Sequence, residues 1–286
     1  MYVVLGANGR AGGETARALI EDGAAVRVVL RRPEQAAPWR ARGAEVAIAS
    51  VDDAEALAMA FAGATGAFLL NPPPVSGDPY ARAQQVGTAL AAAARRAGLS
   101  RAVVLSSIGA QHTTGTGVIA TLNRIEALLD GAAPAVIFLR PGYFVESWGE
   151  VAGAVVAQGV LPTFIEPGHA TPMVSTIDVG RTAAALLRET GTGRRVVELS
   201  GPYDWSAADV AAAFADILKR PVTPAFVPPP ARAALLAEQG IPVEVADALL
   251  GMYAGIADGR VERDAQSEQR RGTVDLKTAI VRLVAP

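Results

Sequence analysis

The sequence contains no cysteine and only two histidines, His112 and His169. The absence of cysteine excludes disulfide bonds, a thiol nucleophile and thiolate metal ligands. The two histidines are far apart in the chain, and neither has a regularly spaced acidic partner. We therefore expect no metal site.

Lysine is also scarce, because Lys219 and Lys277 are the only two among 26 basic residues. The chain before Lys219 therefore contains no lysine, which excludes lysine-based catalysis in its N-terminal part. The net charge of −2 disfavours binding to nucleic-acid phosphates, so we expect no nucleic-acid partner.

The chain has no apolar run of roughly 18 residues, the length that a membrane-spanning helix needs. Its hydrophobic content is nevertheless high, at 51% of 286 residues. Buried parallel strands account for such a composition. Because the first predicted strand begins at Tyr2, we expect no signal peptide, no membrane association and a cytoplasmic protein.

The N-terminal stretch predicts a dinucleotide-binding βαβ unit. A short apolar strand, Tyr2–Leu5, is followed by Gly6, Gly9 and Gly12 and then by a helical pattern. We expect Gly6 to allow a sharp exit from the strand, Gly9 to let a pyrophosphate approach the backbone, and Gly12 to let the helix pack on the sheet. The phosphates would bind free N–H groups at the helix N-terminus. The alternative is a glycine turn without a ligand. The predicted cofactor contacts in this loop are Gly6, Asn8, Gly9, Arg10, Ala11 and Gly12.

The residues after the second predicted strand, 26–30, favour NADP(H) over NAD(H). NAD-binding proteins usually carry an acid there for the ribose 2′-hydroxyl, whereas this chain has Arg31 and Arg32. A guanidinium suits a 2′-phosphate, and a carboxylate would repel it. The alternative is that the two arginines only solvate the strand end.

Six strand-like runs alternate with helical runs over the first half of the chain. They lie at 2–5, 26–30, 45–49, 67–70, 102–105 and 136–139. This alternation predicts an α/β fold with a Rossmann-type doubly wound parallel sheet. We expect an NADP(H)-binding domain at 1–150 and a smaller α/β substrate domain at 151–286, with residues 172–190 packed back on the first domain. Predicted helices include 34–42 and 144–158, and we expect the charged stretch 262–271 to lie across the surface.

Polar residues and prolines follow several predicted strands, at the sheet edge where open α/β sheets bind ligands. Ser106 and Ser107 could hydrogen-bond the nicotinamide ribose or a substrate oxygen, or could only satisfy loop backbone groups. We expect Ser50 and Val51 to face the adenine. The predicted cofactor contacts at this edge are Ser50, Val51, Asn71, Pro72, Ser106 and Ser107.

Two residues near this edge are candidates for proton transfer. His112 lies in the loop after the fifth strand, and histidine is the side chain that most often acts as a general acid or base; the alternative is an ordinary surface histidine. Tyr143 follows the sixth strand and could line a substrate cleft, or could only pack between the two domains. Glu126 is interpreted as structural.

The motifs GANGRAG, VVLRRP, FLLNPP, VVLSSIGA, NRIEALL and VIFLRPGYFVESW together resemble the NmrA-like family of atypical short-chain dehydrogenase/reductases. The resemblance extends to about Ile256. It implies an NADP(H)-binding domain and a small C-terminal substrate domain. Some members of the family look like NAD(P)H-dependent quinone or azo-dye reductases. Others bind the dinucleotide as redox-sensing regulators without turnover.

The Tyr-x-x-x-Lys pattern of the parent superfamily is missing. Tyr80, Tyr143, Tyr203 and Tyr253 are followed four places later by Gln84, Ser147, Ala207 and Ala257. Two hypotheses follow. The chain is an NADPH-dependent oxidoreductase that transfers hydride to a small quinone or azo-type acceptor in an interdomain cleft, or it is a non-catalytic NADP(H) sensor that regulates a protein partner. Isomerase or epimerase chemistry ranks last, because it normally needs the missing tyrosine and lysine.

Overall fold

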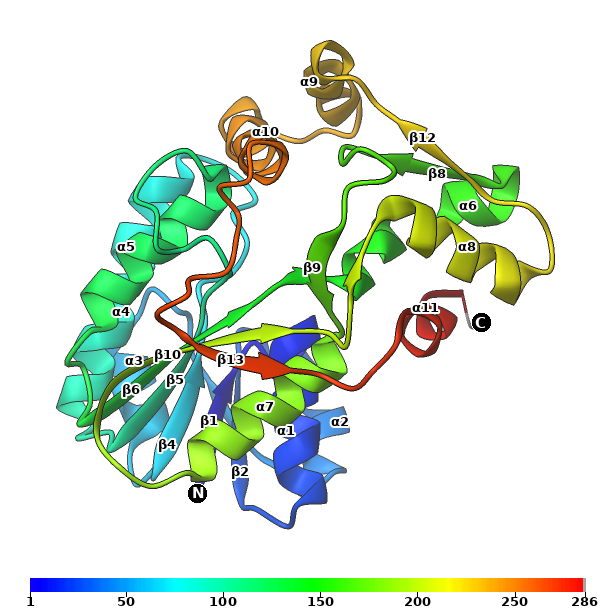
Figure 1. Ribbon diagram of the computed structural model, residues 1–286. Helices are drawn as coiled ribbons and strands as arrows, with labels where there is room; N and C mark the ends of the chain where they lie inside the picture. The colour runs from blue at the N-terminus through cyan, green and yellow to red at the C-terminus, as the bar shows by residue number, and fades with distance from the viewer. Residues whose placement is uncertain (285–286) are drawn as a thin grey trace.

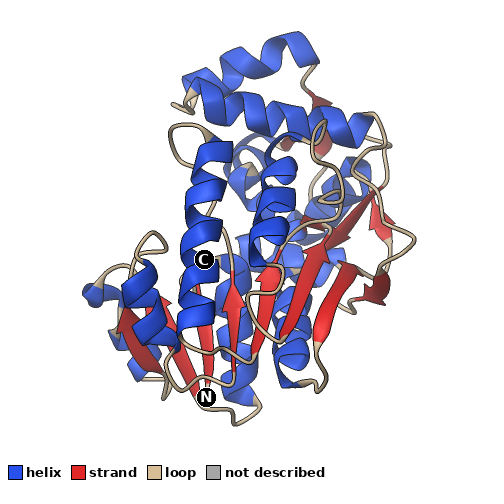
Figure 2. Ribbon diagram, turned by 90° about the vertical axis from the view of Figure 1, so that its left-hand side faces the viewer, coloured by secondary structure: helices blue, strands red, loops and turns tan. Residues whose placement is uncertain are grey.

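The computed structural model describes residues 1–284, and its largest element is an eight-stranded sheet (Figures 1 and 2). The strand order is β13-β10-β6-β5-β4-β1-β2-β3, and all neighbours are parallel. The predicted Rossmann-type α/β fold is therefore confirmed. The strands are β1 (Tyr2–Leu5), β2 (Val26–Leu30), β3 (Glu45–Ile48), β4 (Gly66–Leu69), β5 (Arg101–Leu105), β6 (Ala135–Pro141), β10 (Gly193–Ser200) and β13 (Glu268–Arg271).

The central strands are buried on both faces, which explains their continuous apolar sequences. Every residue of β4 and β6 is buried. The edge strand β3 is only partly covered, since both of its ends are exposed. In the register of the sheet, Tyr2 lies beside Val26 on one side and Gly66 on the other.

Helices cover both faces of the sheet (Figure 1). On one face are α1 (Arg10–Glu21), α2 (Ala37–Arg40) and α7 (Thr176–Arg188), and on the other are α3 (Ala54–Phe61), α4 (Pro79–Arg96) and α5 (Ala120–Leu129). Helices α1 and α7 pack closely against each other. A Cβ at Gly180 would lie only 2.4 Å from the carbonyl carbon of Glu14. Helix α7 therefore shares the core of the large sheet.

A separate apolar core lies beyond the carboxyl ends of the strands. It is formed around Val145, Trp148, Met173, Trp205 and Phe214. Its elements and their neighbours are β7 (Tyr143–Phe144), the 3-10 helix η3 (Val145–Glu150), α6 (Ala152–Gln158), β8 (Val160–Thr163), β9 (Thr171–Val174), β11 (Asp204–Trp205), α8 (Ala207–Leu218), β12 (Thr223–Phe226), α9 (Pro229–Glu238), α10 (Val243–Ala257) and α11 (Leu276–Val284). The domain boundary at residue 150 stays a prediction.

Two local expectations were wrong, and a third was incomplete. The predicted helix 34–42 is instead a 3-10 turn, Pro33–Gln35, followed by the one-turn helix α2, because Pro38 cannot donate the backbone hydrogen bond of a continuous helix. The predicted helix 144–158 is divided into η3 and α6 at Val151. The stretch 262–271 does not only cross the surface, because its last four residues form β13 beside β10.

None of the helices in residues 1–284 combines the length and the apolar composition needed to span a lipid bilayer.

Candidate functional site

The turn between β1 and α1 has the backbone shape that the glycine pattern predicts. Gly6 adopts a left-handed φ of +66°, and a Cβ there would lie 2.7 Å from Leu70 Cδ2. A Cβ at Gly12 would lie 2.4 Å from the carbonyl oxygen of Gly6. Any side chain at Gly12 would therefore push α1 away from the strand.

The N-terminus of α1 is left open for an anion. Its N-cap is Gly9, which has no side chain, and its first turn contains no acid. The first backbone bond runs from Gly13 N–H to the Gly9 carbonyl at 3.1 Å. The N–H groups of the first turn, from Arg10 to Gly12, consequently need a partner outside the helix. A pyrophosphate fits this position, because the helix dipole favours negative charge there.

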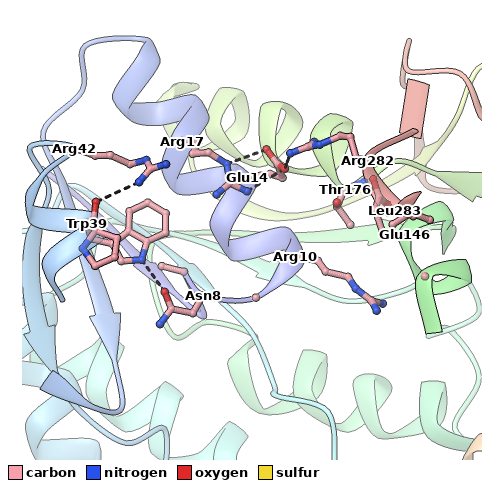
Figure 3. A pocket seen from close by; sticks show the side chains of 14 residues that line it. Asn8, Arg10, Glu14, Arg17, Trp39, Arg42, Glu146, Thr176, Arg282 and Leu283 are labelled. Carbon is pink, nitrogen blue, oxygen red and sulfur yellow. Dashed lines mark hydrogen bonds and ion pairs between the residues drawn. The ribbon is translucent and has the colours of Figure 1, made fainter. Parts of the chain in front are cut away.

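A groove of about 720 Å³ extends from this turn along the outer side of α1 (Figure 3). We call it the phosphate-side groove. Asn8 lies at its edge and accepts a hydrogen bond from Trp39 Nε1 at 2.8 Å. Its lining residues are Ala7, Asn8, Gly9, Arg10, Glu14, Arg17, Pro38, Trp39, Arg42, Glu146, Gly149, Thr176, Arg282 and Leu283.

The charges of the phosphate-side groove are partly paired. Glu14 lies 3.0 Å from both Arg17 Nη2 and Arg282 Nη2. Burial alone would raise the pKa of Glu14, but these two guanidinium groups lower it below its ordinary value. The contact with Arg282 also attaches α11, near the C-terminus, to the helix that follows the glycine turn (Figure 3).

The other residues predicted for the adenosine half lie outside this groove. Arg31 and Arg32 directly follow β2 and are exposed, and Arg32 Nε lies 3.4 Å from Glu34 Oε1. Ser50 is exposed and donates to Asp52 Oδ2 at 3.3 Å. Val51 is buried in the core between the sheet and α3. Their contacts with a cofactor stay predictions.

A second cavity, of about 470 Å³, opens where β5 and β6 end and α10 passes over them. We call it the apolar cavity. It brings together five of the predicted site residues, Asn71, Pro72, Ser106, Ser107 and Tyr143. Its complete lining is Asn71, Pro72, Pro73, Pro74, Leu105, Ser106, Ser107, Ile108, Val118, Ile119, Thr121, Leu122, Pro141, Gly142, Tyr143, Phe144, Ser147, Glu150, Thr171, Pro172, Ile241, Val245, Leu249, Met252, Tyr253, Ile256 and Val261.

Two phenols meet in the wall of the apolar cavity. The hydroxyl oxygens of Tyr143 and Tyr253 are 3.3 Å apart. Burial, followed by the neighbouring Tyr253, raises the pKa of Tyr143 well above its ordinary value, and burial also raises the pKa of Tyr253. Both phenols therefore stay protonated at neutral pH and can donate hydrogen bonds.

The two serines present their oxygen atoms rather than their protons to the apolar cavity. Ser106 Oγ donates to Glu126 Oε1 at 2.6 Å, and Ser107 Oγ donates to the Ile108 carbonyl at 2.9 Å. Each hydroxyl can still accept a hydrogen bond. Asn71 Oδ1 and Thr171 Oγ1 are also buried there without a hydrogen-bond partner in residues 1–284. The polar wall is thus rich in acceptors that suit ribose hydroxyls or a carboxamide.

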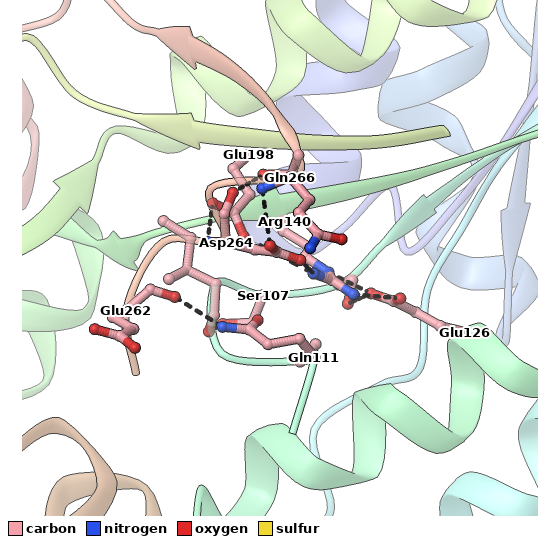
Figure 4. Close-up of polar contacts among 12 residues, drawn as sticks. Ser107, Gln111, Glu126, Arg140, Glu198, Glu262, Asp264 and Gln266 are labelled. Carbon is pink, nitrogen blue, oxygen red and sulfur yellow. Dashed lines mark hydrogen bonds and ion pairs between the residues drawn. The ribbon is translucent and has the colours of Figure 1, made fainter. Parts of the chain in front are cut away.

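A buried ion-pair cluster supports the serine end of the cavity (Figure 4). Glu126 binds Arg140 through two hydrogen bonds of 2.8 Å, and both side chains are 4% exposed. Arg140 Nη1 also lies 3.6 Å from Asp264 and 3.9 Å from the fully buried Glu198. Burial alone would lower the pKa of Arg140, but the hydrogen bonds and charge of Glu126, with Glu198 and Asp264, raise it. Glu126 therefore positions Ser106 and holds α5 on the sheet.

His112 lies apart from the apolar cavity and is not among its lining residues. Its Nε2 is buried and has no hydrogen-bond partner in the described part of the chain. The loop around it is fixed by Gln111, whose Nε2 donates to the Glu262 carbonyl at 3.0 Å, and by Asn123, whose Nδ2 donates to the Ala110 carbonyl at 2.8 Å (Figure 4 labels Gln111 and Glu262). Its role as a proton donor stays a prediction.

Arg10 connects the glycine turn to the apolar cavity. Its Nη1 donates to Ser147 Oγ at 3.0 Å, and its Nη2 lies 3.1 Å from Glu150 Oε1. Ser147 and Glu150 both line the apolar cavity, whereas Arg10 lines the phosphate-side groove. The side chain of Arg10 therefore connects the phosphate-side groove with the apolar cavity.

Sequence reasoning missed Tyr253, Ser147 and Glu150 as site residues. Tyr253 belongs to α10, where it lies in an apolar helix without a motif. Ser147 and Glu150 lie in η3, a stretch for which the sequence predicted a regular helix. From the sequence, Ser147 is marked only as part of the motif VIFLRPGYFVESW and as the residue four places after Tyr143, where the parent superfamily has lysine.

The sequence matches the NmrA-like family over residues 2–275. The chain belongs to the NmrA-like family. It is 25% identical over 254 residues to an NAD(P)H azoreductase of Xenophilus azovorans, covering 89% of this chain and 86% of that protein. It is also 25% identical over 269 residues to quinone oxidoreductase 2 of Escherichia coli, covering 93% of this chain and 92% of the relative.

Solved structures of other proteins share the fold of this chain. An NADPH-dependent quinone oxidoreductase from Escherichia coli, solved in complex with NADPH, superposes with a TM-score of 0.82 at 24% identity, and each chain is covered completely. The Citrobacter triphenylmethane reductase complexed with NADP(H) gives a TM-score of 0.82 at 18% identity, covering 99% of this chain and 100% of that chain. At this identity the likeness shows the fold alone.

Proposed function

We propose that this NmrA-like protein is an NADPH-dependent reductase that transfers hydride to a small quinone or azo-type acceptor. The observation that carries the proposal is the position of the apolar cavity. It lies at the carboxyl ends of β5 and β6, beside the glycine turn, and it is lined by Tyr143 and Tyr253. In open α/β sheets this edge is where ligands bind. The named functions of the azoreductase and quinone oxidoreductase relatives support the same conclusion.

The glycine turn and the neighbouring strand ends would hold the cofactor. The open N-terminus of α1 binds the pyrophosphate, and Arg31 and Arg32 bind the 2′-phosphate. Ser106 and Asn71, which both line the cavity, would accept hydrogen bonds from the nicotinamide half. The dinucleotide supplies the hydride when bound, and the protein supplies orientation and exclusion of water.

Tyr143 is the proton donor that the geometry favours. A hydride brings two electrons and one proton to the acceptor, so reduction of a quinone needs one further proton at oxygen. Tyr143 can give that proton from the cavity wall and accept a replacement from Tyr253 at 3.3 Å. Without a lysine to lower its pKa, the phenol holds its proton tightly, so the transfer is favourable only where the oxyanion that develops on the acceptor is at least as basic as the Tyr143 phenolate. His112 is the second candidate donor.

The test is NADPH oxidation by the purified protein with an excess of menadione, alongside titration of NADPH binding. Turnover that depends on the protein supports the reductase proposal. The missing Tyr-x-x-x-Lys pattern favours the sensor alternative instead. Saturable NADPH binding, without turnover of menadione or of an azo dye, would favour that alternative.

A further inference from the structure

One charged side chain faces an otherwise uncharged cavity. Among the described residues that line the apolar cavity, Glu150 is the only one with an ionisable carboxylate, and none is basic. Its side chain is 71% exposed, which places the carboxylate at the mouth of the cavity rather than in its floor. An acceptor that enters therefore passes a negative charge before it reaches the aliphatic wall.

Arg10, the ion-pair partner of Glu150, forms only a weak pair with it and could bind the cofactor instead. Arg10 Nη2 lies 3.1 Å from Glu150 Oε1, and the two side chains are 42% and 71% exposed. Exposed pairs of this kind contribute little free energy, because water screens them. Arg10 belongs to the glycine turn, where the pyrophosphate of a dinucleotide would compete with Glu150 for its guanidinium. With cofactor bound, the carboxylate and the phosphates together make the mouth negative.

The negative charge of Glu150 affects the two phenols in the cavity wall. Burial is the main reason why the pKa of Tyr143 and of Tyr253 is raised, and the negative charge of Glu150 raises both further. Arg10 acts in the opposite direction on Tyr143. The field of the carboxylate therefore reaches the pair of hydroxyl groups at the cavity wall.

We propose that Glu150 determines the charge selectivity of the apolar cavity, so that it admits neutral or cationic aromatic acceptors and disfavours anionic ones. The inference rests on the proposed reductase function and names the class of acceptor for the same site. A full negative charge on the acceptor, near the carboxylate and partly screened, would lower its affinity roughly fivefold. Neutral acceptors of the same shape would not be affected.

The test compares two quinones in three proteins. The quinones are menadione, which is neutral, and a naphthoquinone sulfonate, which is anionic. The proteins are the wild type, Glu150→Gln and the control Glu238→Gln, whose exposed carboxylate lies on α9 away from the cavity lining. We expect Glu150→Gln to raise the ratio of kcat/KM for the sulfonate to kcat/KM for menadione roughly fivefold, because any effect on the shared proton donor cancels in the ratio. An unchanged ratio of the two values in Glu150→Gln overturns the inference.

Binding measurements separate this inference from the reductase proposal. Trp148 lies 5.9 Å from the Tyr143 ring, so its fluorescence reports quinone binding without turnover. We expect Glu150→Gln to bind the sulfonate roughly fivefold more tightly, and also to bind NADP⁺ more tightly because Arg10 is released. If the wild type binds NADPH but reduces no quinone, the reductase proposal fails while these affinities still test the role of Glu150. If the affinity for the sulfonate does not change, the inference fails even where turnover is observed.

Discussion

The hydroxyl groups of Tyr143 and Tyr253 are 3.3 Å apart, although the residues are separated by 110 positions in the chain. Tyr143 follows β6, and Tyr253 lies on α10, so the contact joins the large sheet to the helical segment that covers its carboxyl edge. Their rings are fixed by further aromatic contacts, Tyr143 with Trp148 at 5.9 Å and Tyr253 with Phe164 at 5.1 Å. One hydroxyl of the pair donates to the other, so one phenolic proton remains available to a ligand in the apolar cavity.

The first prediction concerns proton transfer. Tyr143→Phe should lower kcat for menadione about 100-fold, because a general acid typically contributes two to four orders of magnitude, while NADPH affinity stays unchanged. Steady-state kinetics and a binding titration measure the two effects. Tyr203→Phe is the matched control, since the Tyr203 side chain is 69% exposed and outside the cavity lining. An unaltered kcat in Tyr143→Phe would move the proton donor elsewhere, with His112 the next candidate.

The second prediction concerns stability at alkaline pH. Burial raises the pKa of Tyr143 above its ordinary value of 10.0, so the folded protein keeps a proton that the unfolded chain loses. The contribution of this phenol is therefore complete below pH 10.0 and is lost as the pH rises from there through the folded pKa. Urea unfolding at a series of pH values around and above 10.0 should show a steeper loss in the wild type than in Tyr143→Phe. Parallel curves for the two proteins would contradict it.

The third prediction concerns the choice of dinucleotide. Arg31→Ala should weaken NADPH binding about tenfold and leave NADH binding nearly unchanged, because only NADPH has the phosphate that the guanidinium would bind. The comparison variant is Arg95→Ala, which removes one positive charge from the exposed end of α4. Isothermal titration with both cofactors gives the affinities. Equal losses for NADPH and NADH in Arg31→Ala would refute the role in 2′-phosphate binding.

The fourth prediction concerns the buried ion pair. Glu126→Ala should lower the free energy of unfolding by about 3–5 kcal/mol, because it removes both hydrogen bonds that Arg140 makes to a carboxylate and leaves the buried guanidinium with only the more distant Asp264 and Glu198. Glu55→Ala removes a carboxylate from an exposed pair with Arg96 and should cost at most about 1 kcal/mol. Urea unfolding at neutral pH measures both. A loss in Glu126→Ala as small as that in Glu55→Ala would show that the cluster is not a structural support of the cavity.

The parts of the fold that local sequence determines were predictable. The strand β1, the glycine turn and α1 follow one another in 20 residues, and Gly6 and Gly12 lie where a side chain would clash with neighbouring atoms. Strands β1 to β6 are apolar runs with helices between them, which is typical of a parallel sheet buried on both faces. The capping box Ser206–Asp209 also marks the start of α8, as its sequence indicates.

The parts that depend on distant contacts were not predictable in this way. The strand β13 is Glu268–Arg271, four polar residues whose pairing with β10 leaves no hydrophobic pattern. Tyr253 and Glu150 reach the apolar cavity only because α10 and η3 fold over the sheet edge. His112, placed at the same edge by sequence reasoning, lies outside the cavity lining, and its neighbour Gln111 donates to the Glu262 carbonyl. These residues are placed by contacts between segments that are distant in the chain, and residue type alone does not indicate such contacts.

The most direct test of the central claim is a single-turnover measurement of hydride transfer. The protein saturated with NADPH is mixed rapidly with menadione, and the absorbance of the reduced nicotinamide is followed. We expect a fast decay that depends on the protein, slows with NADPH deuterated at the transferred position, and is retained in the control Gly153→Val, whose added side chain meets open space. The decay should be lost in Gly9→Val, where the side chain occupies the place of the pyrophosphate. Saturable binding of NADPH with no protein-dependent decay would contradict the claim that this chain is a reductase of such acceptors.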